Sequence, residues 1–213
     1  MLIPCAYTFI DRFCVGVVIS SFVLFLADCH ALGPDERSRL LAMFLVPFAL
    51  LVYPAGRLVD RLGVTLPLAG GSAAFGLLFA AYGFLPREWL PVAMFASGVL
   101  SAAMFAPTLT LIAAWSDAER RGAACARFNA AGALGFVCGP LIAGTICHSL
   151  ADVWGARAAY QTAFIIAGMA EFACAAATLP WLLRIAKRDA RGQELAAQAR
   201  FTGRAEAAAT AGG

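Results

Sequence analysis

The sequence predicts an all-α, polytopic membrane protein, and two observations support this fold class. The chain of 213 residues is 62% hydrophobic and only 14% charged, with a mean hydropathy of +0.78. A soluble domain of that composition would expose large apolar patches. The chain also contains six apolar stretches of roughly 20 residues, the length at which an α-helix crosses about 30 Å of hydrocarbon.

Each apolar stretch is expected to form one membrane-spanning helix. The first has no basic region before it and is too long for the apolar part of a cleaved signal peptide, so we expect it to remain as the first span. The expected spans are residues 7–29, 38–56, 65–85, 89–115, 123–149 and 158–183.

The chain changes character at Lys187. From there it is rich in Arg, Gln, Ala and Gly, with too few large apolar groups to pack into a core. We therefore expect a six-helix transmembrane domain at residues 1–186 and a flexible cytoplasmic tail at residues 187–213. The first part of the tail forms either a frayed extension of the last span or a helix that lies along the membrane surface.

The basic residues predict the orientation, because short cytoplasmic loops retain positive charge during insertion. The second loop, the fourth loop and the tail contain eleven of the 16 Lys and Arg residues, whereas the opposite loops contain four. Both termini are therefore predicted to be cytoplasmic, and the net charge of +3 reflects this bias. No basic stripe with interleaved aromatic residues indicates nucleic-acid binding.

The seven cysteines follow no metal-ligand or redox spacing, and most lie within or beside apolar stretches. Two Cys-His pairs, Cys29-His30 and Cys147-His148, fall at the outer ends of the first and fifth spans. They leave a soft-metal site or a disulfide open as alternatives. We expect no metal and no cofactor. The sequence also lacks a phosphate-binding loop, a serine-nucleophile elbow and a dinucleotide-binding glycine motif, so we expect the protein not to be an enzyme.

A short charged turn joins the second and third apolar stretches. Its pattern is Gly56-x-x-x-Asp60-Arg61-x-Gly63. The two glycines suit a tight turn and close backbone approach, whereas Asp60 and Arg61 can pair with other charges or cap helix ends. These residues are compatible with a gating latch and equally with an ordinary positive loop at the cytoplasmic surface.

A second pattern, Gly135-x-x-x-Gly139-Pro140, lies in the fifth apolar stretch. Together with Gly132 and Ala143, the two glycines follow helical spacing and form a stripe of small residues. Another helix can approach closely along such a stripe. Pro140 removes a backbone donor and tends to kink the helix near the preceding turn.

Together these patterns resemble those of the major facilitator superfamily of secondary transporters. The turn is similar to the family's loop between helices two and three, and the Gly-Pro pattern to a motif of its antiporter and drug-efflux branches. The resemblance implies two inverted three-helix repeats. It implies that Asp60 steadies the outward-facing state and that the bent helix at Pro140 seals the pathway against leak, with plain helix packing as the alternative. The basic pair usual after the second glycine is replaced by Val64-Thr65.

Three ionisable residues fall inside apolar stretches, where a charge is costly and marks a candidate site. Asp11 and Arg12 lie near the cytoplasmic start of the first stretch, which the resemblance places along the central cavity. Asp11 can carry a proton or bind a cationic substrate; alternatively, both side chains reach the interface. Glu171 lies near the middle of the last stretch and should be neutral or paired. Because the family's sixth helix is peripheral, contact with a partner is its other interpretation.

The family's complete fold has twelve helices, so the resemblance over residues 7–183 covers one six-helix half, either the first or the second. We predict proton-coupled efflux of a small solute by alternating access, in a membrane expected to be a bacterial inner membrane. The chain is expected to act as a homodimer or with a second half, packed on the small-residue stripe. The alternative is a truncated or non-transporting membrane protein that binds or regulates a full-length transporter. The substrate cannot be read from the sequence.

Overall fold

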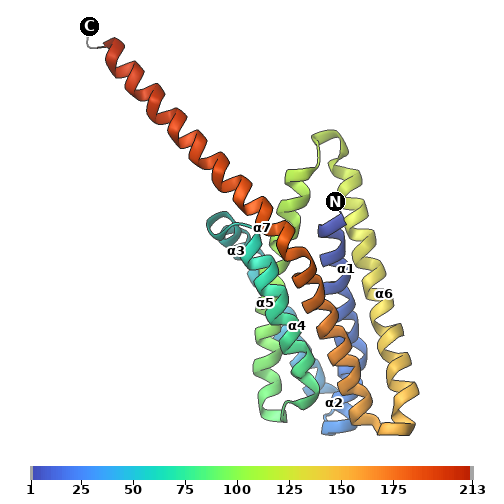
Figure 1. Cartoon of the computed structure of the whole chain (residues 1–213). Coiled ribbons are helices and arrows are strands. Elements are labelled where there is room, and N and C mark those ends of the chain that lie inside the picture. The colour runs from blue at the N-terminus through green and yellow to red at the C-terminus, as the bar shows by residue number, and fades with distance from the viewer. Residues whose placement is uncertain (1, 212–213) are drawn as a thin grey trace.

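The computed structural model is a bundle of membrane-length helices packed side by side (Figure 1). It describes the backbone of residues 2–211 and the side chains of residues 2–187, apart from residues 60, 118 and 185. Strands are absent from this part of the chain. The elements are α1 (Leu2–Val17), η1 (Val18–Phe22), α2 (Val23–His30), α3 (Pro34–Leu62), η2 (Leu66–Gly70), α4 (Gly71–Ala81), η3 (Tyr82–Phe84), η4 (Arg87–Trp89), α5 (Leu90–Trp115), η5 (Ala118–Arg120), α6 (Arg121–Trp154) and α7 (Ala156–Ala211).

Six helical segments in the described residues are long and apolar enough to cross a membrane, which confirms the six predicted spans. The first combines α1, the π-helical η1 and α2, and the third runs from η2 through α4 into η3. The spans are Leu2–His30, Pro34–Val59, Leu66–Phe84, Arg87–Trp115, Arg121–Trp154 and Ala156–Arg184. The chain is therefore a multi-pass membrane protein.

Local sequence sets both ends of α3. Pro34 occupies its first turn, where a missing N–H is tolerated, and the Gly33 amide donates to the Glu36 carboxylate at 3.3 Å. The helix ends at Gly63, whose φ of 73° lies in the left-handed region. The turn expected at Gly56 is wrong, because α3 continues to its end at Leu62 and a Cβ on Gly56 would meet nothing within 4 Å.

Each helix of the first three spans packs mainly on one helix of the last three. These pairs are α1 with α6, α3 with α5, and α4 with α7. A Cβ on Gly16 of α1 would lie 2.9 Å from Cδ of Pro140 in α6, and one on Gly98 of α5 would lie 2.8 Å from Cγ of Pro47 in α3. The arrangement is unchanged when spans one, two and three are exchanged with four, five and six. The two three-helix repeats, expected from the resemblance alone, are therefore visible in the packing.

The α4–α7 pair crosses at its own glycine contact. A Cβ on Gly76 would lie 2.5 Å from the carbonyl oxygen of Gly168, and a Cβ on Gly168 would in turn meet the carbonyl oxygen of Gly76. Backbone touches backbone at this point, which only glycine permits on both sides. The contact is reciprocal because spans three and six are equivalent to one another in the two repeats.

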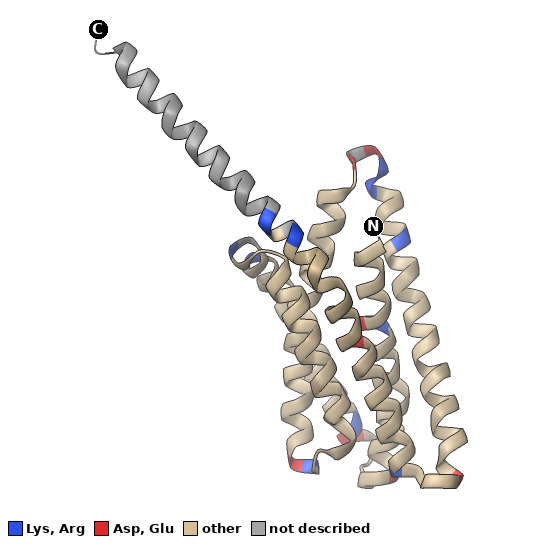
Figure 2. Ribbon diagram, viewed as in Figure 1, with Lys and Arg blue, Asp and Glu red and all other residues tan. Residues whose placement is uncertain are grey.

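One end of the bundle, called here the basic end, gathers the start of α1, the α3–η2 and α5–α6 connections, and the Arg184–Lys187 segment of α7 (Figure 1). Figure 2 shows stretches of ribbon that belong to Lys and Arg at the two connections and on the α7 segment. That this end faces the cytoplasm stays a prediction. The backbone of α7 continues as a helix to Ala211, but the side chains from residue 188 onward lie outside the described residues. A flexible tail at residues 187–213 likewise stays a prediction.

Candidate functional site

Asp11 lies inside the bundle, where α1 faces α5. Asp11 is 4% exposed and lies nine positions after Leu2, the first residue of α1. Nine positions correspond to roughly 14 Å along a helix. Oδ1 accepts a hydrogen bond of 3.1 Å from the Ser101 hydroxyl of α5, whereas Oδ2 is buried and has no hydrogen-bond partner among the described residues. The alternative in which Asp11 reaches the interface is therefore wrong.

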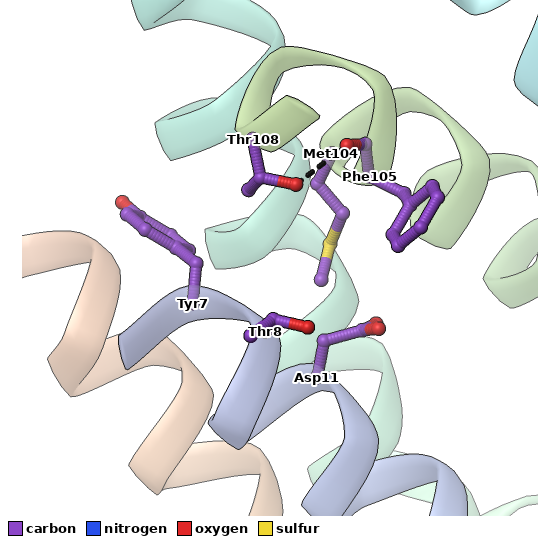
Figure 3. A pocket seen from close by; sticks show the side chains of 6 residues that line it. All are labelled: Tyr7, Thr8, Asp11, Met104, Phe105 and Thr108. Carbon is purple, nitrogen blue, oxygen red and sulfur yellow. Dashed lines mark hydrogen bonds between the residues drawn. The ribbon is translucent and has the colours of Figure 1, made fainter. Parts of the chain in front are cut away.

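A small cavity of ≈ 10 Å³ lies beside the carboxyl group (Figure 3). That is about the room that one water molecule requires. Figure 3 shows Thr8 and Asp11 projecting from α1 toward Met104 and Phe105 of α5. The hydroxyl of Thr108 donates to the Phe105 carbonyl at 2.6 Å. Oxygen atoms of Thr8 and Asp11 therefore face a space of about the size of one water molecule.

Arg12 points into a cage of three phenylalanine rings from three helices. Its Cζ lies 5.6 Å from the ring centre of Phe48 in α3, 5.0 Å from that of Phe105 in α5 and 5.4 Å from that of Phe136 in α6. At these distances the ring faces attract the cation. Nε is 3.8 Å from Oδ2 of Asp11, which is close enough for charge attraction but too long for a hydrogen bond.

A larger cavity of ≈ 440 Å³ opens beside Arg12 between α1, α5 and α6. Its polar lining comes from Arg12, Thr8 and Asn129, and the other lining residues are Phe105, Phe128, Gly132, Ala133 and Phe136. We call this surface the Arg12 face. The Arg12 side chain is 19% exposed there, far from either end of the first span. A guanidinium facing hydrocarbon at that depth is strongly unfavourable, so the Arg12 face requires water or protein against it.

Glu171 lies between α1, α4 and α7 and is completely buried, at 0% exposure. Oε1 accepts a hydrogen bond from the Ser72 hydroxyl of α4. The Cys14 thiol of α1 lies 4.0 Å from Oε2 and 3.5 Å from the Ala167 carbonyl. No cation pairs with Glu171 among the described side chains. Such surroundings favour a neutral carboxyl group, because a lone buried charge is very costly. Its burial excludes direct contact with a partner protein.

The small-residue stripe of α6 is occupied within the chain. Cβ atoms on Gly135 and Gly139 would meet the carbonyl oxygens of Phe9 and Phe13 in α1, and Ala143 is 2% exposed. The expectation that a partner packs on this stripe is therefore wrong: α1 already covers it. The pattern predicted close approach correctly but could not say which helix approaches.

Of the two charges in the Gly56–Gly63 pattern, Asp60 and Arg61, only Arg61 has a described side chain. Arg61 is exposed in the last turn of α3, where a cation is favoured by the helix dipole. The side chain of Asp60 lies outside the described residues, so its role as a latch stays a prediction. The neighbouring Arg57 is engaged locally: its guanidinium lies 5.2 Å from the Tyr53 ring centre and donates to the Tyr53 hydroxyl at 3.3 Å.

The cysteines form no disulfide; all seven are free. In the described part of the chain, no group of three or more His, Cys, Asp or Glu side chains could hold a metal ion. Neither alternative left open by the two Cys-His pairs is formed. The residues that sequence reasoning missed are the partners of the acids, Ser72 and Ser101, and the rings around Arg12. A serine or phenylalanine within an apolar stretch carries no signal by itself.

The fold and the site define a polytopic α-helical membrane protein that buries its ionisable groups at mid-depth beside a cavity. Proteins of this class move solutes across membranes. The chain belongs to the Major Facilitator Superfamily, whose family model matches residues 5–209. A search of curated proteins gives no match. The resemblance that rested on two short motifs is thus confirmed across nearly the whole chain, and the protein is a member of a family of membrane transporters.

Proposed function

We propose that this chain forms one half of a secondary active transporter that expels a small solute by alternating access and is driven by protons. The observation that supports proton coupling is the hydrogen bonding of the Asp11 carboxyl group. One carboxyl oxygen is held by Ser101, while the other is buried without a hydrogen bond and lies 3.8 Å from Nε of Arg12. Such an oxygen can accept a proton without breaking an existing contact.

Arg12 can couple that proton to the solute. Its guanidinium connects two places, the carboxyl group of Asp11 and the cavity of the Arg12 face. Approach of the guanidinium to Asp11 stabilises the carboxylate, and withdrawal favours the protonated acid. A solute that enters the cavity and displaces Arg12 from its phenylalanine cage toward Asp11 would therefore release the proton. Exchange of proton for solute is the antiport that the Gly-Pro motif favours.

The Arg12 face also supports the need for a second half. Covering it with another six-helix unit would place Arg12 in an enclosed cavity between two bundles, where an alternating-access site belongs. A homodimer and a pairing with a different half-chain both satisfy this requirement. A bacterial inner membrane remains part of the proposal.

The experiment measures solute and proton movement together. Everted membrane vesicles that contain the chain, alone and with a candidate second half, are energised with a pH gradient. They are then challenged with ethidium and a panel of small amphipathic solutes. We expect Asp11→Asn to lower proton-coupled flux by about 10-fold or more, because the amide cannot take up a proton. Asp28→Asn is the matched control, since Asp28 accepts a hydrogen bond from Tyr160 at 2.7 Å and lies away from the Arg12 face.

Flux that persists in Asp11→Asn, or that a protonophore does not reduce, would contradict proton coupling. It would still support transport of the solute. If no combination of halves moves any solute although the chain inserts normally, the alternative of a non-transporting membrane protein would be favoured.

A further inference from the structure

An apolar groove of ≈ 550 Å³ runs between the third span, at η2 and the start of α4, and α7 at the basic end of the bundle. Its one hydroxyl group, on Thr65, donates to the Leu182 carbonyl at 3.1 Å and is therefore already satisfied. The other residues that line the groove have apolar side chains or are glycine. Side chains that line it include Leu66, Ala69, Ala73, Phe172, Leu179 and Leu183.

Small side chains leave this groove open. The two helices are in backbone contact at Gly76 and Gly168. From that crossing toward the basic end, η2, α4 and α7 present small residues to the groove, such as Gly70, Ala73 and Ala176. These groups cannot fill the space between the two helices. A long, narrow apolar ligand can fill this space.

The groove has the length of one membrane leaflet. On α7 it extends from Phe172 to Ala186, which are fourteen residues apart. That separation corresponds to roughly 21 Å of helix. Half of a bilayer, headgroup region included, measures about 20–22 Å. Phe172 lies near the middle of the span Ala156–Arg184 and Ala186 just beyond its end, so the groove runs from mid-depth to the headgroup level.

Exposed cations stand where the groove reaches the surface. Arg184 and Lys187 lie on α7, and Arg61 directly precedes the lining residue Leu62. Lys187 is four positions after Leu183 and therefore continues the groove-lining face of α7. Basic residues at this level attract anionic lipid headgroups, at roughly five-fold in affinity for each residue.

We propose that the groove binds one anionic phospholipid, with an acyl chain between the third span and α7 and the phosphate held by Arg61, Arg184 and Lys187. The groove is built mainly by η2 and α7, whereas the Arg12 face is built by α1, α5 and α6. A second half that covers the Arg12 face leaves the groove in contact with lipid. The lipid site is therefore independent of the proposed transport function.

Native mass spectrometry of the full chain tests this site. Delipidated protein is titrated with phosphatidylglycerol or with phosphatidylcholine of the same acyl chains. We expect one phosphatidylglycerol to be retained in preference to phosphatidylcholine. The double variant Arg184→Gln/Lys187→Gln should lower that affinity by roughly 25-fold, at five-fold for each cation. Arg57→Gln should leave it unchanged, because Arg57 is an exposed cation of α3 that is engaged by Tyr53.

A second pair of variants separates acyl-chain binding from headgroup attraction. Ala176→Phe fills the groove and should reduce retention of both lipids, whereas Ala177→Phe should not, since Ala177 is equally exposed but does not line the groove. Equal retention of the two lipids by the unmodified chain would overturn the proposal. So would unchanged binding in the double variant, or equal binding by the two phenylalanine variants. A dimer lost in Ala176→Phe but kept in Ala177→Phe would show that a second copy occupies the groove instead.

Discussion

Gly16 of α1 and Gly98 of α5 occupy equivalent places in the two three-helix repeats, since each lets its helix touch a proline-containing helix of the other repeat. The position five residues before each glycine is Asp11 in the first repeat and Ala93 in the second. Both side chains are buried, at 4% and 5% exposure. The two repeats thus share their helix contacts but differ in chemistry at the same point.

The third and sixth spans show the same difference. Gly76 and Gly168 are equivalent, and three residues later stand Phe79 in α4 and Glu171 in α7, each at 0% exposure. An apolar residue therefore suffices at either position for packing. The glycine contacts are therefore common to both repeats and belong to their shared architecture. The two buried acids, Asp11 and Glu171, each occur in one repeat only, and the architecture does not require these additions.

The largest effect is expected where the repeats agree. Gly16→Ala and Gly98→Ala each place a methyl group against a proline ring and a backbone carbonyl of the facing helix, and both should destabilise the fold by about 1–3 kcal/mol. Gly144→Ala is the control, because a Cβ there meets nothing within 4 Å. Thermal unfolding in mild detergent measures the three variants. Clearly different losses in Gly16→Ala and Gly98→Ala would break the equivalence of the two crossings.

An effect of similar size is expected at the additions, and it separates the two acids. Glu171→Ala removes the acceptor of the Ser72 hydroxyl and should cost about 1–3 kcal/mol, whereas Glu171→Gln keeps an acceptor and should cost much less. Because the surroundings of Glu171 favour its neutral form and it lies away from the Arg12 face, Glu171→Gln should also retain proton-coupled flux. Unfolding and vesicle flux are measured on the same preparations. A folded Glu171→Gln protein without flux would assign proton transfer to Glu171 as well as to Asp11.

The smallest effect concerns the ends of the second and fifth spans. Gly63 ends α3 at a φ of 73° and Gly155 ends α6 at a φ of 82°. Gly63→Ala and Gly155→Ala should therefore each cost about 1–2 kcal/mol, the strain of an alanine at positive φ in an extended region that is almost confined to glycine. Gly56→Ala should instead stabilise α3 by about 0.5–1 kcal/mol, because Gly56 is an interior helix residue. Chemical unfolding resolves the three variants, and a destabilised Gly56→Ala would restore a tight-turn role for that glycine.

Sequence reasoning succeeded wherever the residues of a single segment determine the local structure of that segment. Gly63 follows a run of helical residues and precedes a new apolar stretch, so a turn there could be read directly. Pro54 and Gly56 together suggest a break, but both lie inside α3, so the family motif gave the wrong local structure there. Asp11 was visible as a candidate, but its proximity to one end of an apolar stretch left the interface open as an alternative. The hydroxyl of Ser101, 90 residues away, decides that it is buried.

The sequence by itself determined the six spans, the charge bias between the two ends of the bundle and the family. These follow from apolar length, from the placement of Lys and Arg, and from short motifs, because a helix in a membrane must satisfy its backbone within its own segment. Only the tertiary structure decided that α1 covers the glycine stripe, that three rings surround Arg12, and that Ser72 meets Glu171. Those contacts join residues far apart in the chain. They depend on which helix faces meet. Helical periodicity shows which residues share one face of a helix, but it does not show which helix packs against that face.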